Sequence, residues 1–145
     1  MVDIKIRNES GNPNPEYATE GSAGMDLRAN LKDDILLKPG QRVAIPTGLY
    51  IQLPDGFQAE VRPRSGLALK DGITVLNTPG TVDSDYRGEI KVILINLSNE
   101  GFVVKNADRI AQLVITRYEK IKWINVSELE STKRADGGFG HSGKE

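Results

Sequence analysis

The sequence contains no cysteine, one histidine and no hydrophobic run long enough to cross a membrane. Without cysteine the chain can form no disulfide, thiolate metal site or thiol nucleophile, which fits a reducing compartment. The lone histidine, His141, excludes a site that needs two imidazoles. Because the N-terminus also has no apolar signal core, we expect a cytoplasmic protein with no membrane partner.

Neither positive nor negative charge is in excess. The chain carries 19 Lys and Arg residues against 20 Asp and Glu residues, a formal net charge of −1 at pH 7. A general nucleic-acid binder should carry a basic excess on its surface. We therefore expect no nucleic-acid partner.

The chain is rich in short β-type segments that are separated by glycine and proline. Its 145 residues suit one domain, which would bury roughly 68% of the surface of the unfolded chain. Residues 2–7 alternate apolar and charged side chains, as a strand with one buried face does, and residues 57–63 and 110–116 are also of strand type. Residues 64–72 are the first that resemble a helical turn, with Ser65 in a position to cap it. The pattern predicts an all-β fold of the closed or sandwich type.

The composition changes near the C-terminus. We expect a last strand within residues 118–126 and a capped helical turn at residues 127–130. Beyond them the chain holds four glycines and one large apolar residue, Phe139, which is too little to fold alone. We therefore divide the chain into a β-domain, residues 1–130, and a mobile, glycine-rich C-terminal arm, residues 131–145.

A polar turn between two β-branched runs contains the residues that most strongly suggest a functional site. Residues 80–88 (GTVDSDYRG) lie between strand-type runs at 73–76 and 90–95, so we expect a hairpin. This turn would hold the carboxylate of Asp83 beside the ring of Tyr86. A charged surface turn is the simpler interpretation of its other polar residues, but Asp83 directly follows an apolar residue and is expected to face inward.

Two further segments have groups that suit an anion. Residues 63–66 (PRSG) offer a guanidinium, a hydroxyl and free backbone amides. The arm offers a glycine-rich stretch, residues 137–143, between the cations Arg134 and Lys144, although it is not a Walker A loop. Taken singly, these segments are explained as well by a solvated turn and a disordered tail. The same is true of three polar residues beside strands: Asp26, Arg109 and Gln112.

Taken in order, five segments resemble the five motifs of the trimeric dUTP pyrophosphatases, or dUTPases. They are residues 23–27 (AGMDL), 63–68 (PRSGLA), 80–88 (GTVDSDYRG), 108–113 (DRIAQL) and 134–143 (RADGGFGHSG). The resemblance covers nearly the whole chain, and five motifs in register are far more specific than one. It implies a jelly-roll-like β-barrel and a homotrimer whose active sites each draw on three subunits. The arm of one chain would close over a site built by its neighbours.

The resemblance also implies a reaction, the hydrolysis of dUTP to dUMP and pyrophosphate with Mg²⁺. In the family this reaction keeps uracil out of DNA and supplies dUMP for thymidylate synthesis. Asp83 matches the carboxylate that activates the attacking water as a general base, with attack at the α-phosphorus. Tyr86 matches the ring that packs under the deoxyribose and leaves no room for a 2′-hydroxyl. The hairpin would read the uracil edge through Asn77, Gly80, Thr81, Val82, Asp83 and Lys91.

The other motif residues of the β-domain match contacts to the triphosphate. Arg64, Ser65 and Gly66 match the phosphate-binding motif of the family. Gln112 matches an amide near the α-phosphate, and Arg109 matches a structural or phosphate-side position.

The resemblance gives the arm and the metal their roles as well. Phe139 would stack over the uracil when the arm closes. Mg²⁺ would sit on the phosphates and on water, with no direct protein ligand, and Asp26 would hold those waters. The γ-phosphate end would be held by Arg134, His141, Ser142 and Gly143.

Two other interpretations are considered. A dCTP deaminase shares the fold, but it needs a proton-shuttling carboxylate on the next strand, where this chain has Ile93. A non-catalytic domain could instead use its nucleotide-bound arm as a switch for a protein partner. The presence of both Asp83 and Tyr86 argues against a purely structural protein.

Overall fold

Eleven strands and one short helix make up the part of the chain that the computed structural model describes, residues 2–138. The helix is α1 (Ser65–Asp71). The strands are β1 (Lys5–Asn8), β2 (Gly24–Arg28), β3 (Ile35–Leu37), β4 (Arg42–Pro46), β5 (Leu49–Gln52), β6 (Phe57–Arg62), β7 (Ile73–Val75), β8 (Gly80–Val82), β9 (Lys91–Asn96), β10 (Phe102–Val104) and β11 (Arg109–Arg117).

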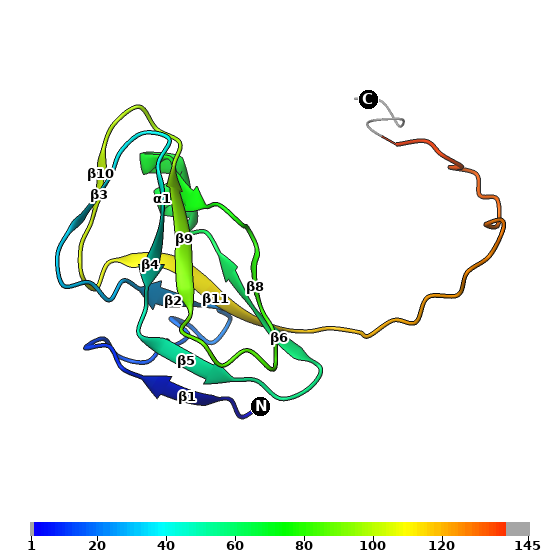
Figure 1. The fold of residues 1–145 in the computed structure, drawn as a ribbon, viewed down its shortest axis with the longest axis horizontal. Helices are drawn as coiled ribbons and strands as arrows, with labels where there is room; N and C mark the ends of the chain where they lie inside the picture. Colours follow the sequence, from blue (N-terminus) through cyan, green and yellow to red (C-terminus); the bar gives the residue numbers. More distant parts are fainter. Residues whose placement is uncertain (1, 139–145) are drawn as a thin grey trace.

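Two antiparallel sheets enclose the core (Figure 1). One has the strand order β2-β11-β6-β8, and the other has the order β4-β9-β7. The pairs β1-β5 and β3-β10 extend the structure at its edges. This arrangement confirms the all-β, jelly-roll-like fold that the sequence predicts.

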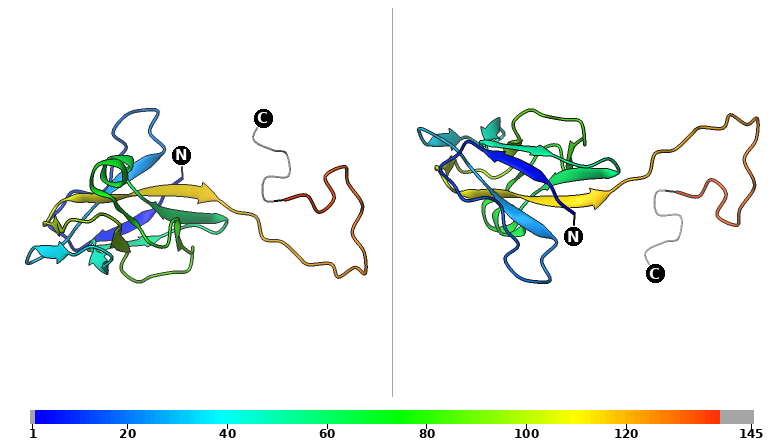
Figure 2. Two further views of the ribbon diagram at one scale, coloured as in Figure 1. Left: turned by 90° about the horizontal axis from the view of Figure 1, so that it is seen from above. Right: turned by 90° about the horizontal axis from the view of Figure 1, so that it is seen from below.

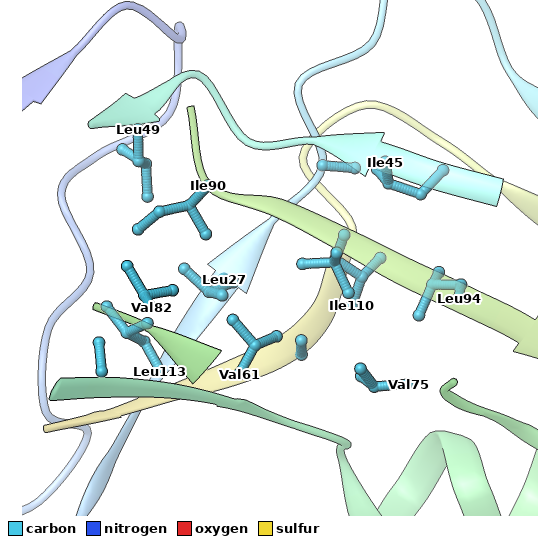
Figure 3. Close-up of a cluster of buried hydrophobic side chains, with 14 of the residues drawn as sticks. Leu27, Ile45, Leu49, Val61, Val75, Val82, Ile90, Leu94, Ile110 and Leu113 are labelled. Carbon is cyan, nitrogen blue, oxygen red and sulfur yellow. The ribbon is translucent and has the colours of Figure 1, made fainter. Parts of the chain in front are cut away.

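The core consists of aliphatic side chains from both sheets, several of which Figure 3 labels. In β9, Val92 and Leu94 are fully buried, while the intervening Ile93 is only half-buried, as expected when side chains alternate between two faces. From the opposite sheet, Leu27 and Ile110 join the same cluster. All four residues from 92 to 95 are apolar, so the sequence predicts a strand here but not which face is buried; that face is set by the place of β9 between β4 and β7.

The first strand differs from its sequence prediction. β1 begins at Lys5, pairs only with β5, and leaves Val2 and Ile6 about two-fifths exposed. These apolar residues line an open cleft beside Tyr17 and Met25 rather than entering the core. The expected buried face is therefore only partly covered in this chain, because β1 lies at an edge with no sheet packed over it.

The segment after β11 also differs from its prediction. Residues 118–138 extend away from the body as an irregular chain (Figures 1 and 2), with no strand at 118–126 and no helical turn at 127–130. At its start the amide of Tyr118 donates to the carbonyl of Gly56 at 3.1 Å, but the segment forms no strand pairing among the described residues. Its large apolar side chains are exposed: Ile121, Trp123, Ile124, Val126 and Leu129.

No helix among the described residues is long and apolar enough to cross a membrane. The only helix there, α1, has seven residues and contributes no buried side chain to the core. The division of the chain at residue 130 stays a prediction.

Truncating a leucine in the core should destabilise the protein far more than truncating a leucine in an exposed connection. Leu94→Ala removes a fully buried side chain from β9, so we expect the free energy of unfolding to fall by about 2–5 kcal/mol. Leu97→Ala, three residues later at a position that is 67% exposed, is the matched control and should change stability by less than about 1 kcal/mol. Urea denaturation of both variants measures the difference, and equal losses would contradict this assignment of the core.

Candidate active site

The connection between β7 and β9 carries the acidic turn. The two strands pair as expected for a hairpin, with Val75 opposite Leu94. Between them, β8 leaves this sheet and pairs with β6 of the other, with Val82 opposite Ala59. The segment 80–88 therefore bridges the two sheets, which the simple hairpin prediction did not anticipate.

Asp83 lies immediately after β8, at the edge of an open cleft. Val82 takes the buried position, so the alternation of side chains turns Asp83 outward rather than inward as the sequence suggested. The cleft has a volume of about 590 Å³ and is lined by Asp55, Gln58, Asp83, Ser84, Asp85, Tyr118 and Lys120. The carboxylate is thus accessible to a ligand from solvent or from another chain.

Tyr86 is held in one orientation over the turn. Its hydroxyl donates a hydrogen bond to the carbonyl oxygen of Glu89 at 3.0 Å. The ring lies against Gly88, where a Cβ would overlap the hydroxyl oxygen and lie 2.9 Å from ring atom Cε2. Glycine at position 88 is therefore what allows the ring to fold down, and the ring still keeps 45% of its surface exposed.

The far side of the turn is fixed to the connection between β4 and β5. The buried hydroxyl of Thr47 donates to the carbonyl of Ile90 at 2.6 Å. The amide of Gly48 donates to Oε1 of Glu89 at 2.9 Å, and the amide of Ile90 donates to the carbonyl of Leu49 at 2.8 Å. These three bonds hold the Glu89–Ile90 peptide, whose carbonyl oxygen accepts the hydrogen bond from the Tyr86 hydroxyl.

A second polar cluster centres on Asp26 of β2. Nε of Arg64 donates to Oδ1 of Asp26 at 3.0 Å, and Nη1 of Arg109 donates to Oδ2 at 3.2 Å. Nη1 of Arg64 also contacts the carbonyl of Arg109 at 3.3 Å. Three of the sequence-predicted residues, from three separate motifs, are therefore joined directly.

Gln112 and Ser65 lie next to this cluster. Gln112 pairs with Asp26 on one side and with Arg62 on the other, and a Cβ on Gly24 would lie 3.3 Å from its Oε1. The sequence predicts that Ser65 caps α1, but Ser65 is the first residue of the helix. Arg64 takes the N-cap position, with extended backbone angles.

The Asp83 turn and the Asp26 cluster lie at opposite ends of β6 (Figure 1). Gln112 lies opposite Arg62 at the end of β6, whereas Gln58, at its start, lines the cleft of Asp83. At ~3.3 Å per residue the six residues of β6 separate the two groups by roughly 15–20 Å. One chain therefore does not bring all the predicted site residues together.

The residues expected to read a base lie along β8 and the start of β9. The side-chain nitrogen of Asn77 is 3.2 Å from where a Cβ on Gly80 would stand, so these two are neighbours. Thr81 is exposed and Val82 is buried, and Lys91 forms a 3.7 Å ion pair with Glu89. The Asn77 side chain therefore lies beside the backbone at the start of β8.

The residues predicted on the arm are mostly beyond the described part of the chain. Arg134 lies in a turn of the extended segment that Figure 1 shows leading away from the sheets, and its Nε donates to the carbonyl of Gly137 at 2.8 Å. Four other predicted residues lie outside residues 2–138: Phe139, His141, Ser142 and Gly143.

Metal ligands do not converge in the described residues. Nowhere between residues 2 and 138 do three His, Asp or Glu side chains form a group that could hold a metal ion. The donor sets that exist are single carboxylates beside cations, as at Asp26, or separate carboxylates around a cleft. Such a set suits a divalent ion that takes most of its ligands from phosphate and water.

Sequence reasoning missed the residues that support the turn. Gly88 is the last residue of the motif and Glu89 follows it, so the part that both play could have been noticed from their position. The contact of Thr47 with Ile90 spans 43 positions and leaves no local signal. Tyr118 and Lys120 line the Asp83 cleft because β11 runs beside β6, which no local pattern shows.

The comparison with known proteins gives one family. A family model described as dUTPase matches residues 12–143. The deoxyuridine 5′-triphosphate nucleotidohydrolase of Fusobacterium nucleatum is 56% identical, covering 99% of this chain and 98% of that protein. The protein of the same name from Finegoldia magna is 54% identical over 98% of this chain and 99% of that protein. The protein of the same name from Rickettsia felis is 58% identical over 96% of this chain and 93% of that protein.

Solved structures are similar in fold. A variant of the dUTPase of Staphylococcus bacteriophage 80alpha, determined with dUpNHpp, superposes with a TM-score of 0.83 at 23% identity, covering 97% of this chain and 98% of that one. A variant of the dUTPase from phage phi11 of S. aureus has a TM-score of 0.80 at 20% identity, covering 89% of this chain and 99% of that one. That structure reveals the coordination of a structural Mg(II) ion. At these identities the likeness supports the fold alone.

The position of the Tyr86 ring can be tested through Gly88. In Gly88→Ala the new methyl group would occupy the space of the tyrosine hydroxyl, so we expect the ring to swing out and lose its hydrogen bond to Glu89. Gly21→Ala is the matched control, because a Cβ at position 21 meets nothing within 4 Å. A crystal structure of each variant, or the loss of ring contacts in NMR spectra, measures the change. An unmoved ring in Gly88→Ala would refute this steric argument.

Proposed function

The chain belongs to the dUTPase family, and from this we propose that it hydrolyses dUTP to dUMP and pyrophosphate. The observation that carries the proposal is the single turn that holds an accessible carboxylate, Asp83, three residues from a tethered ring, Tyr86. The identity of 54–58% to proteins named deoxyuridine 5′-triphosphate nucleotidohydrolase supports the same conclusion. We expect the protein to act in the cytoplasm.

We propose that Asp83 is the general base of the reaction. Its carboxylate takes a proton from a water molecule while the water oxygen forms a bond to the α-phosphorus. The bond from that phosphorus to the bridging oxygen breaks, and pyrophosphate leaves. A positioned base of this kind contributes typically 10²–10⁴-fold to the rate.

We propose that the turn also selects the nucleotide. The ring of Tyr86, held down on Gly88, would lie under the deoxyribose and leave no space for a 2′-hydroxyl. The backbone of residues 80–83, with the Asn77 amide beside it, would pair with the donors and acceptors of uracil, and Lys91 at the start of β9 would add a contact. A cytosine would leave a buried donor unpaired, at a cost of ~1–3 kcal/mol.

The triphosphate needs groups that the Asp83 end of the chain does not have. We propose that Arg64, Ser65, Gly66 and Gln112 bind the phosphates, with Arg109 supporting Arg64. Because these residues lie roughly 15–20 Å from Asp83 in the same chain, we infer that they come from a neighbouring subunit. A homotrimer with shared active sites satisfies this requirement.

We propose that the third contribution comes from the arm. Phe139 would cover the uracil, and the γ-phosphate end would be bound by Arg134, His141, Ser142 and Gly143. The exposed apolar side chains between residues 121 and 129 support assembly, because they have no core of their own chain to join.

Mg²⁺ would supply charge neutralisation on the phosphates when it is bound. Hard Mg²⁺ keeps several waters and takes phosphate oxygens at nucleotide sites, so it would need no cluster of three acidic side chains. Asp26 is the carboxylate nearest the proposed phosphate-binding arginines and could hold one of those waters.

No observation favours a dCTP deaminase. Ile93, which occupies the position of the required carboxylate, is a half-buried aliphatic residue of β9 and cannot shuttle a proton.

The function is tested by a comparison of substrates and of one variant. We expect the purified protein with Mg²⁺ to release pyrophosphate from dUTP, and to act at least about 100-fold more slowly on dCTP, dTTP and UTP. Asp83→Asn should bind dUpNHpp normally but lose about 10²–10⁴-fold in turnover. Release of dUTP from dCTP would point to the deaminase, and full turnover by Asp83→Asn would remove it as the base.

Sharing of the site between chains is tested by mixing two inactive proteins. Asp83→Ala lacks the proposed base, and Arg64→Ala lacks a proposed phosphate contact at the other end of β6. After co-refolding at equal amounts, about a quarter of the sites should combine one intact half from each chain, so activity should recover to about a quarter of the wild-type level. Mixing the folded proteins without subunit exchange is the control. If both residues acted within one chain, co-refolding would restore nothing.

A further inference from the structure

Both oxygens of the Asp26 carboxylate accept hydrogen bonds from guanidinium groups. Each of its oxygens accepts from a different arginine, Oδ1 from Arg64 and Oδ2 from Arg109, at 3.0 and 3.2 Å. The contact of Arg64 Nη1 with the carbonyl of Arg109 links the two arginines to each other. The three residues come from β2, from the residue before α1, and from β11.

These contacts determine which donors of Arg64 are free. A guanidinium has five N–H donors, and here Nε–H and one N–H of Nη1 are directed to Asp26 and to the Arg109 carbonyl. The remaining three donors lie on the two terminal nitrogens, one on Nη1 and two on Nη2, and none of them has a partner among residues 2–138. Because the side chains of Arg64 and Asp26 are both 25% exposed, these terminal donors can still reach a ligand.

We propose that Asp26 is a positioning residue that acts through Arg64 and Arg109, orienting the guanidinium edge that binds the triphosphate. The inference rests on the proposed function, since it deepens the account of the same site. An arginine that is already oriented loses less side-chain freedom when it binds a phosphate. Asp26 would therefore contribute to nucleotide affinity even when no metal is present.

Charge alone predicts the opposite result. Asp26 is an anion beside a site for an anion, so its removal should strengthen triphosphate binding by simple electrostatics. A role limited to holding metal-bound water would leave binding in the absence of metal unchanged. Weaker metal-free binding after loss of the carboxylate is thus a result that only the positioning role produces.

The test is the affinity of the full-length protein for dUpNHpp in EDTA, measured by calorimetry. We expect Asp26→Asn, which keeps the shape of the side chain, to bind about tenfold more weakly than wild type. Asp26→Glu, which restores the charge but displaces the oxygens, should recover part of the loss.

A double-mutant cycle shows whether the effect passes through Arg64. In an Arg64→Gln background, Asp26→Asn should cause little further loss of affinity, because the group that it orients is gone. Glu9→Gln is the matched control: it breaks a similar pair, between Glu9 Oε1 and Arg7 Nε at 3.2 Å, on β1 and the residue after it. It should leave the affinity unchanged.

The proposal fails if Asp26→Asn binds dUpNHpp in EDTA as tightly as wild type or more tightly. It also fails if the losses from Asp26→Asn and Arg64→Gln simply add. Thermal melting shows whether each variant is folded, and Asp26→Glu provides a second reading should Asp26→Asn not fold. Failure of the proposed function is seen separately, as a wild-type protein that neither cleaves dUTP nor binds dUpNHpp.

Discussion

The antiparallel register of β6 with β8 and β11 is the constraint on which the rest of the structure depends. It sets Val61 opposite Gly80 and Arg62 opposite Gln112, so the acidic turn and the arginine cluster emerge from opposite ends of one sheet. A shift by one residue would turn the aliphatic side chains of β6 out of the core, so the register is firmly specified by burial. The separation of the two halves of the proposed site is therefore a property of the barrel itself.

Each half is held by a few polar contacts between segments that are distant in sequence. At the acidic turn, the buried bond from Thr47 to Ile90 and the bond from Gly48 to Glu89 fix the backbone beneath the Tyr86 ring. Each such bond contributes only about 0.5–1.5 kcal/mol to stability. At the other half, Asp26 joins two arginines at a site that is only partly buried, where the gain in orientation matters more than the gain in stability. In both halves these contacts thus fix the positions of the groups more than they add to the stability of the fold.

Patterns along the chain predict the fold class and several of its strands, because alternation and turn residues are local properties. The strands near residues 57–63 and 110–116, and the turn that carries Asp83, follow from such patterns, whereas the other residues of the proposed site come from the resemblance of the five motifs. The path of β8 into the opposite sheet does not, because it depends on β6 as a partner far away in the sequence. The same reason explains why residues 118–126 look like a strand and yet are not one in this chain: a strand needs a neighbour, and composition does not say where the neighbour comes from. The engagement of Asp26 with both Arg64 and Arg109 was likewise invisible, although all three were recognised.

The extended segment beyond β11 carries the only tryptophan of the chain, Trp123, with 84% of its surface exposed. An indole in water emits at longer wavelengths than one that is packed against apolar groups. The intrinsic fluorescence of this protein is therefore a label-free reporter of the surroundings of the segment, with no second indole to obscure the signal. A dilution series followed by emission wavelength would read out whether separate copies cover it.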